Sequence, residues 1–161
     1  MSAGQADVTL AMDAMDAMDA MDAIEDLAMA AAVPEMRRLA RELIPALLEG
    51  KDARLKTLLL QWQTANVTIA AASCWGFYAD IAVLSEAPRV QAMSLCGGNA
   101  VIPVLDCREP AGCVLYVVDG ALHFLEVYSV FAWEKPPVFG PAQHVQPFAF
   151  PTTVVGKGQG A

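Results

Sequence analysis

The dipeptide Asp119-Gly120 constrains the fold of this chain more than any other feature of its sequence. It lies between two runs rich in β-branched and aromatic residues, VLYVV at 114–118 and ALHFLEVY at 121–128. A two-residue turn of the primed type favours Asp and Gly at its central positions. We therefore expect the chain to reverse direction at Asp119-Gly120 and to form an antiparallel β-hairpin.

A two-residue turn also predicts the register of this hairpin. One face carries the pairs Val118–Ala121, Tyr116–His123 and Val114–Leu125. The other face carries Val117–Leu122, Leu115–Phe124 and Cys113–Glu126, with Tyr128 beyond them. Side chains alternate across a strand, so we expect the second, more apolar face to pack against helices. The first face is too apolar to be left bare, which predicts cover by the C-terminal segment or by a second subunit.

Two helices are predicted before the sheet. Pro34 and Glu35 suit the first turn of a helix, and apolar residues then recur at one-face spacing: Met36, Leu39, Ala40, Leu43 and Leu47. Pro45 predicts a kink or a break, and Gly50 is a good C-terminal cap. Asp52 can cap a second helix that runs through Gln63. The apolar stripe of this second helix is Leu55, Leu58, Leu59 and Trp62.

From Asn66 onward the pattern is typical of strands. Residues 67–70 and 77–84 read as two strands around a turn at 73–76, and residues 99–106 read as another, confined by Pro103 to an edge or a bulge. The fold class that follows is α+β, with two N-terminal helices packed on a four- to five-stranded antiparallel sheet. We expect an acidic low-complexity leader at 1–33, a single α+β domain at 34–137, and a Pro/Gly-rich C-terminal tail of coil at 138–161.

The acidity of the chain belongs to the leader. Residues 1–33 contain the repeat Met-Asp-Ala and seven of the 18 acidic residues, but no Lys or Arg, whereas the other 11 acidic residues face 10 basic ones. The arginines at 37, 38 and 41 alternate with Glu35 and Glu42, which predicts a solvated helix face. A protein that binds nucleic acid needs a basic surface to displace counterions from phosphates. We therefore expect no nucleic-acid partner.

The four cysteines do not suggest a metal site. Cys74, Cys96, Cys107 and Cys113 form no C-x-x-C pair and have no His at ligand spacing, so we expect no metal and no cofactor. Free thiols in a reducing cytoplasm are the simplest interpretation, and a Cys107–Cys113 disulfide is the alternative. Residues 113–133 are apolar enough to resemble a membrane span, but they include Asp119 and Glu126. Each such charge costs about 2.5–3.5 kcal/mol at the centre of a membrane helix, so we expect no membrane insertion.

Glu126 is the leading candidate site residue. The expected register places its carboxylate at one end of the core-facing row, where it must reach water, pair with Arg108, or accept a hydrogen bond from Tyr128 or Tyr78. It is either a carboxylate at the rim of the sheet or a polar anchor in a pocket beneath the helices. Cys74, in the predicted turn, is either a reactive thiol or a small buried residue. The candidate binding residues are therefore Glu126, Tyr128, Tyr78 and Cys74.

Two segments of the chain resemble a group of small bacterial α+β proteins of unassigned activity. The middle segment of that group is similar to Q-x-x-x-A-x-V followed by T-G-V-G-F-F-T-x-F, against QWQTANV at 61–67 and SCWGFYADI at 73–81 here. The later segment is similar to F-x-L-F-V-x-D-G-x-L-x-x-L-E-x-Y, against residues 114–128, and the WEKP at 133–136 resembles a closing signal of the group. This chain departs from the pattern at Cys74 and Trp75. The resemblance implies a compact α+β domain and no particular activity.

The sequence contains no motif typical of an enzyme. It has only two histidines, and it lacks a G-x-S-x-G, a phosphate-binding glycine loop, an H-E-x-x-H and a paired-carboxylate motif. We therefore expect a non-catalytic cytoplasmic protein-interaction module, of the immunity or antitoxin type, that forms a homodimer or binds a protein partner. The alternative is a small-molecule binder or hydrolase with a pocket around Glu126.

Overall fold

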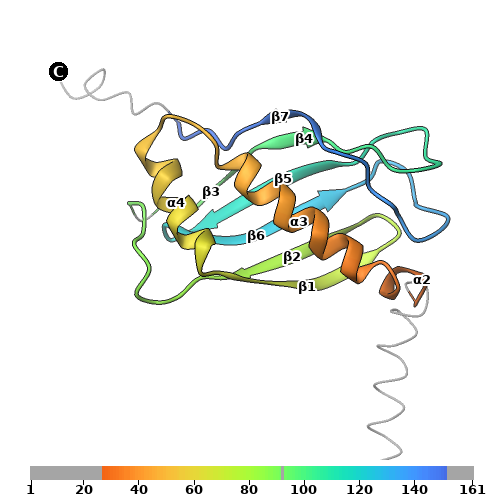
Figure 1. Cartoon of the computed structure of the whole chain (residues 1–161), viewed down its shortest axis with the longest axis horizontal. Coiled ribbons are helices and arrows are strands. Elements are labelled where there is room, and N and C mark those ends of the chain that lie inside the picture. Colours follow the sequence, from red (N-terminus) through yellow and green to blue (C-terminus); the bar gives the residue numbers. More distant parts are fainter. Residues whose placement is uncertain (1–26, 92, 152–161) are drawn as a thin grey trace, which may run out of the picture.

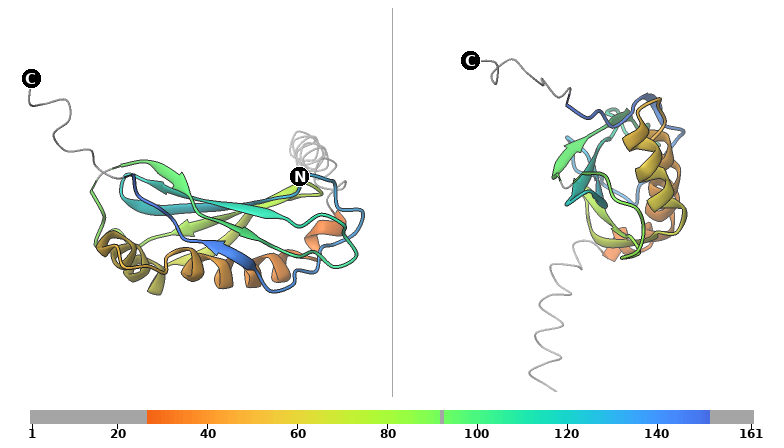
Figure 2. Two further views of the ribbon diagram at one scale, coloured as in Figure 1. Left: turned by 90° about the horizontal axis from the view of Figure 1, so that it is seen from above. Right: turned by 90° about the vertical axis from the view of Figure 1, so that its left-hand side faces the viewer.

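The computed structural model describes residues 27–91 and 93–151 of the chain. Its main layer is a five-stranded antiparallel sheet in the order β1-β2-β6-β5-β3, and two helices, α3 and α4, cover one face of that sheet (Figures 1 and 2). The expected α+β class and the N-terminal position of the helices are confirmed. A second, two-stranded sheet, β4-β7, adds to the expected strands. Most of the leader predicted at 1–33 lies outside the described residues.

The helices begin and end close to their predicted positions. A short helix, α2 (Leu27–Ala30), precedes α3 (Val33–Leu47), in which Pro34 occupies the first turn. Pro45 lies in the last turn of α3, and the helix continues past it to Leu47, so the expected break does not occur there. Only the carbonyl of residue 41 loses a helical partner through this proline, which makes the position tolerable near a helix end. The side chain of Asp52 caps α4 (Ala53–Gln63) by accepting a hydrogen bond from the backbone N–H of Arg54 at 2.9 Å.

Two strands of the main sheet, β2 and β5, alternate regularly between buried and more exposed residues. The strands of this sheet are β1 (Asn66–Ser73), β2 (Gly76–Ala82), β3 (Leu95–Gly97), β5 (Gly112–Val118) and β6 (Ala121–Tyr128). The predicted turn between β1 and β2 is confirmed, whereas β3 lies outside the segments that the sequence predicts to be strands. Of the strand expected at 99–106, only Asn99–Val101 forms a strand (β4), and Ile102 and Val104 form isolated bridges beyond it.

The core lies between the helices and the inner face of the sheet. The stripe of α3 is buried as predicted, and it packs over buried side chains of the central strands: Phe77, Ala79, Cys113, Leu115, Val117, Leu122, Leu125 and Val127. On α4, Leu55 and Leu58 are buried, whereas Leu59 and Trp62 are partly buried. Met29 and Ala32 also belong to this core, so the last residues of the predicted leader are part of the folded unit.

Gln61 is a buried polar residue that joins α4 to the β5–β6 turn. Its amide nitrogen donates to the carbonyls of Pro88 and Gly120 at 2.8 and 3.0 Å. Its amide oxygen accepts from the backbone N–H of Leu122 at 2.9 Å. Because every polar atom of the amide has a partner, the side chain can remain fully buried without an unsatisfied group.

The turn at Asp119-Gly120 is confirmed. Both residues have positive φ, 50° and 78°, as a primed two-residue turn requires. Next to the turn, Val118 pairs with Ala121 and Val117 with Leu122, as predicted. Beyond these two pairs the register differs from the prediction, because β6 contains one additional residue.

The additional residue is His123, which forms a β-bulge opposite the step from Tyr116 to Val117. Tyr116 pairs with Phe124 instead of His123, and Leu115 pairs with Leu125 instead of Phe124. Likewise, Val114 pairs with Glu126 instead of Leu125, and Cys113 pairs with Val127 instead of Glu126. The bulge reverses the two faces of β6 after His123, because side chains alternate along a strand. It directs Leu125 and Val127 into the core and Glu126 away from it, and so avoids the cost of burying a carboxylate among apolar side chains.

The segment after residue 137 is part of the fold. It contains β7 (Gln143–Gln146), so the expectation of coil is wrong there, and it places Phe139 and Phe148 in the core. The backbone N–H of Phe148 donates to the carbonyl of Leu47 at 2.7 Å. The segment therefore closes the gap between α3 and the β4 edge and does not lie over the outer face of the main sheet (Figure 2).

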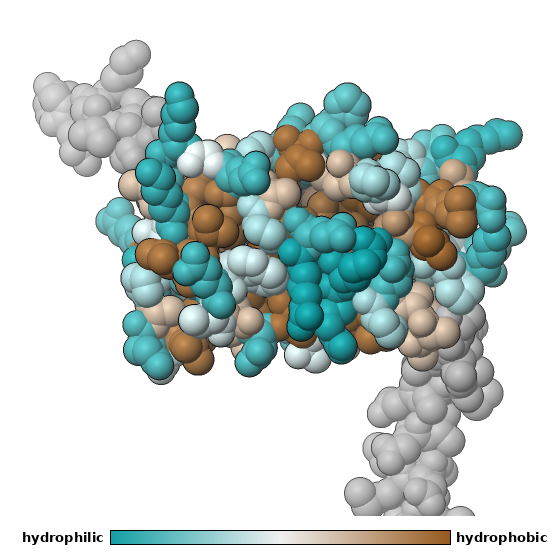
Figure 3. Space-filling view, in the orientation of Figure 1, coloured by the Kyte–Doolittle hydropathy of each residue, from teal (hydrophilic) through white to brown (hydrophobic). Residues whose placement is uncertain are grey.

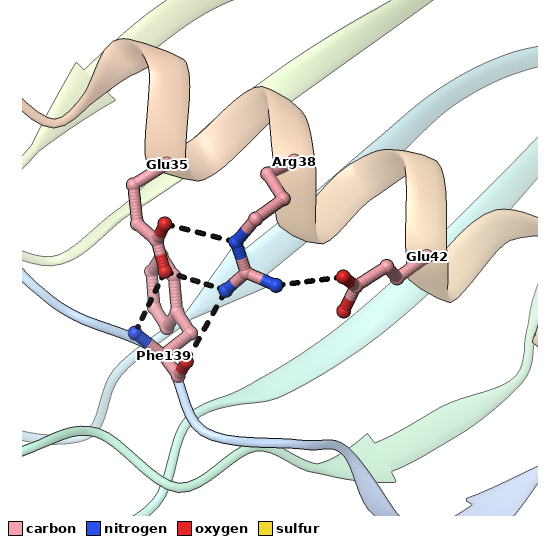
Figure 4. A network of polar contacts seen from close by, with 4 residues as sticks. All are labelled: Glu35, Arg38, Glu42 and Phe139. Atoms are coloured by element: carbon pink, nitrogen blue, oxygen red, sulfur yellow. Dashed lines mark hydrogen bonds and ion pairs between the residues drawn. The ribbon is translucent and has the colours of Figure 1, made fainter.

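A charged network fixes the start of this segment to α3 (Figure 4). Arg38 donates to Glu35 and Glu42 on the same helix, and also to the carbonyl of Phe139 at 3.2 Å. Glu35 accepts from the backbone N–H of Phe139 at 3.2 Å. Figure 3 shows a hydrophilic surface over α3, and the ion pairs of Arg38 with Glu35 and Glu42 agree with the predicted solvated helix face. Arg38 therefore also has a structural role.

Candidate functional site

The candidate site lies on the outer face of the main sheet, the face turned away from α3 and α4. The outer face is the solvent-facing side of β2, β5 and β6, and the candidate site on it consists of Tyr78, Tyr116, Phe124, Glu126 and Tyr128. The expected position of Glu126 in the core-facing row, with a pocket beneath the helices, is wrong, because the bulge at His123 turns Glu126 outward. The carboxylate lies instead on the open side of the sheet, partly exposed to solvent.

Glu126 is held between two tyrosines on neighbouring strands. Tyr78 on β2 is directly opposite Glu126 and donates its hydroxyl to Oε1 at 3.2 Å. Tyr116 on β5 donates its hydroxyl to Oε2, also at 3.2 Å. Tyr78, one of the three residues that the sequence offers as partners for Glu126, is thus confirmed, and Tyr116 is an additional partner that sequence reasoning missed.

This carboxylate and the local surroundings raise the pKa of both hydroxyls above the ordinary phenol value. The negative charge of Glu126 raises the pKa of Tyr78, and the hydrogen bond between them adds to that effect. Desolvation raises the pKa of Tyr116, with the hydrogen bond to Glu126 as the second cause. Both tyrosines therefore remain neutral donors at physiological pH, and Glu126 supplies the negative charge of the group.

Aromatic contacts hold the tyrosine rings in place. The ring of Phe124 stacks on Tyr116 with centroids 4.1 Å apart and planes 18° apart, and it meets Tyr78 edge-on at 5.8 Å. Stacked and edge-on aromatic pairs each add about 0.5–1.5 kcal/mol beyond their buried area. Phe124 thus fixes both tyrosines that hold the carboxylate, although the sequence places it in the core.

A cavity of about 500 Å³ opens next to Glu126 at the β1–β2 end of the outer face. Its wall includes Glu126, Tyr78 and Tyr128, which are three of the four candidate residues, and also Trp75. Tyr128 lies over Gly112, where an added Cβ would be 2.6 Å from the phenol ring. Gly112 is therefore required for Tyr128 to lie flat against β5.

Cys74, the fourth candidate, is not part of this wall. Its side chain is partly buried and packs against the core, and its carbonyl accepts from the backbone N–H of Trp133 at 2.7 Å. The neighbouring Trp75 is instead 56 % exposed. The backbone N–H of Trp75 donates to Ser73 Oγ at 3.0 Å, which fixes the turn. Trp75 therefore lines the cavity of the candidate site, whereas Cys74, in the same turn, packs against the core.

The groups that line the cavity are suited to binding. The hydroxyl of Ser73 accepts from the turn backbone, and that of Ser129 donates to the carbonyl of Phe131 at 2.6 Å. Neither histidine lines the cavity, so neither serine has an imidazole base beside it.

All four cysteines are free, which excludes the Cys107–Cys113 disulfide in this structure, and burial raises the pKa of Cys113 to about 11. Cys113 is therefore an inert thiol at neutral pH.

Two further findings concern metal-binding clusters and membrane-spanning helices in the described residues. Across 27–91 and 93–151, no three side chains among His, Cys, Asp and Glu are grouped closely enough to hold a metal ion. In the same ranges, no helix has both the length and the apolar character that are needed to cross a bilayer.

A second cavity, of about 570 Å³, lies beside the segment 129–135 and is lined by Asp106, Arg108, Glu109 and Lys135 among others. Its charges are of both signs, and Lys135 already pairs with Asp106 at 2.6 Å. Arg108 lines this cavity and does not pair with Glu126 within the described residues. The outer face is therefore the stronger candidate site, because its carboxylate, Glu126, is in none of the ion pairs within the described residues.

Comparison of the chain with protein-family models, with curated proteins and with solved structures gives no match. The resemblance of residues 61–81 and 114–136 to a group of small bacterial proteins therefore stays a prediction.

Proposed function

We propose that this protein is a non-catalytic protein-interaction module, of the immunity or antitoxin type, that binds its partner through the outer face of the sheet. The observation that carries the proposal is the exposure of three large aromatic side chains beside Glu126. Trp75 is 56 % exposed, Tyr78 43 % and Tyr128 37 %. Tyrosine and tryptophan are enriched at protein interfaces, where they often supply most of the binding energy.

The proposed partner is a different protein. A homodimer with two-fold symmetry over this face would bring the same patch of each subunit together and place two uncompensated Glu126 carboxylates in one interface. Like charges at close range oppose such an interface. The free state of all four thiols supports a reducing compartment, and we propose the bacterial cytoplasm.

Affinity capture with matched variants tests this function. The wild-type protein, the double variant Trp75→Ala/Tyr128→Ala and the control Leu60→Ala are used as bait in lysate of the native host, with mass spectrometry as the readout. Leu60 is a suitable control because it is 51 % exposed but lies on α4, in the helix layer. We expect one partner to be retained by the wild type and by Leu60→Ala, and lost from the double variant.

Two results would contradict the proposal. One is a partner that the double variant retains and Leu60→Ala loses, since that places the interface on the helices. The other is a monomer in sedimentation that captures nothing reproducible. A homodimer in sedimentation that the double variant dissociates would replace the proposed partner with a second copy of the chain.

The cavity beside Glu126 supports a second candidate, a small-molecule binder. Its volume of about 500 Å³ falls within the usual range of ligand sites. A thermal-shift screen separates the two functions, because a ligand at 100 times its dissociation constant stabilises the folded state by about 2.7 kcal/mol. The absence of any shift across a broad metabolite panel would remove this candidate.

A further inference from the structure

The cavity on the outer face combines one carboxylate with three exposed aromatic side chains. Glu126, Trp75, Tyr78 and Tyr128 line the same space of about 500 Å³. A ligand that enters this space therefore meets a negative charge and aromatic surfaces together. This combination selects for a particular ligand chemistry, which can be deduced from the contacts of the carboxylate.

The carboxylate of Glu126 has hydrogen-bonding capacity left on both oxygens. Each oxygen accepts one tyrosine hydroxyl, Oε1 from Tyr78 and Oε2 from Tyr116, both at 3.2 Å. A carboxylate has about four lone-pair positions, two on each oxygen. One acceptor position therefore remains on each oxygen, and the two tyrosines hold these oxygens in a fixed orientation.

The charge of this carboxylate is not compensated by a cation of the described chain. The four ion pairs within residues 27–91 and 93–151 join Arg38 to Glu35, Arg38 to Glu42, Arg54 to Asp52 and Lys135 to Asp106. None of them includes Glu126. The two neighbouring hydroxyls are neutral donors, so the group as a whole carries one negative charge that a bound cation would balance.

We infer that this cavity binds a guanidinium group, which an arginine side chain of the partner supplies. A guanidinium is planar and offers two parallel N–H donors to the two oxygens of a carboxylate, and it also stacks on aromatic rings. Both features are present here, since Glu126 has one free position on each oxygen and Trp75, Tyr78 and Tyr128 line the same cavity. An ammonium group is a point charge that gains only the cation–π contacts and one or two hydrogen bonds.

This inference rests on the proposed function, because it names the group that the partner would insert. Titration of the full chain, followed by ¹H–¹⁵N NMR, tests it with three probes of similar size: N-acetyl-arginine methylamide, the corresponding lysine derivative and the corresponding citrulline derivative. Citrulline has the shape of arginine without its charge. We expect saturable shifts at the Trp75 indole N–H and the Glu126 amide with the arginine probe, and much weaker shifts with the other two.

A pair of carboxylate variants locates the binding. Glu126→Gln should weaken the arginine probe at least about tenfold, since a hydrogen bond to a charged group contributes about 1.5–3 kcal/mol. Asp80→Asn is the matched control and should bind as the wild type does. Asp80 is exposed on the same face of β2, two residues from Tyr78, but it does not line the cavity.

The outcomes separate this inference from the proposed function. Equal binding of the arginine and citrulline probes, or equal loss in both carboxylate variants, would overturn the inference. If the arginine probe does not bind while partner capture still depends on Trp75 and Tyr128, the inference fails and the interaction function stands. If excess arginine probe releases the captured partner, the arginine belongs to that partner. If the probe binds without releasing it, the assignment to the partner is overturned in favour of a free guanidino compound.

Discussion

Deletion of His123 from the middle of a central strand should leave the fold intact. His123 is the additional residue of the β6 bulge, and Leu122 and Phe124 on either side of it pair with adjacent residues of β5. Without His123, these pairs follow one another in a regular antiparallel ladder, and Glu126 still faces outward. The deletion therefore removes the irregularity without shifting the register.

The cost of this deletion can be estimated from the contacts of His123. The side chain is exposed, and its ring meets Phe124 edge-on with centroids 5.5 Å apart. An aromatic contact of this kind contributes about 0.5–1.5 kcal/mol, and a bulged residue contributes no ladder pair. We expect the deletion to lower the free energy of unfolding, measured in urea, by no more than about 2 kcal/mol. This limit covers both the lost aromatic contact and the lost local twist of the bulge.

Deletion of Ala79 is the matched control. Ala79 lies in the adjacent central strand, is fully buried, and pairs with Leu125 of β6 in a regular stretch of the ladder; its partner on β1, Ile69, is next to a register shift. Its loss reverses the faces of β2 on one side of the gap and drives either Tyr78 or Asp80 towards the core. Burial of an unpaired carboxylate costs several kcal/mol, and exposure of a large apolar side chain costs about 1.5–3 kcal/mol more, so this variant should not fold. If the His123 deletion is as damaging as the Ala79 deletion, or if NMR shows that Tyr116 no longer pairs with Phe124, the bulge assignment is refuted.

Two further predictions concern polar contacts of the helices. Gln61→Ala should lower the free energy of unfolding by about 2–4 kcal/mol, because it leaves the buried N–H of Leu122 and the carbonyl of Pro88 without their partner; a loss below about 0.5 kcal/mol in urea unfolding would contradict this role. The hydrogen bond from Arg38 lowers the pKa of Glu35, so the associated stability is complete above the usual pKa of 4.5 and is lost as the pH falls through the lower folded value. Glu35→Gln and Arg38→Gln should each reduce the loss of stability between pH 6 and pH 3 in urea unfolding, and an unchanged pH dependence in both would disprove the coupling.

The parts of the fold that depend on local chemistry could be predicted from the sequence. Pro34 begins a helix, Asp52 caps the next one, and Asp119-Gly120 reverses the chain, because each of these effects involves only a few neighbouring residues. The register beyond the turn could not be predicted in this way. A bulge adds a residue without a composition signal, and its position at His123 is decided by which side chains the core accepts.

The candidate site illustrates the same limit. Glu126 and Tyr78 can be selected from the sequence as polar residues in an apolar context, and the structure brings them together. Tyr116, Phe124 and Trp75 were missed because their roles depend on cross-strand neighbours that a one-residue change in register alters. A pattern of alternating aromatic residues on both strands, considered with every possible bulge position, is the signal that would have suggested them.

The burial of Phe139 and Phe148 has a consequence for how the protein is made. Phe139 contacts Phe77 and Trp133, with ring centroids 6.1 and 5.7 Å apart, and Phe148 is attached to the end of α3. During synthesis, a nascent chain that has emerged only as far as β6 lacks both rings, so its hydrophobic interior is still open along one side. Stable tertiary structure should therefore arise late in translation, after residue 148 has left the ribosome, and until then the growing polypeptide presents apolar surface that chaperones can recognise.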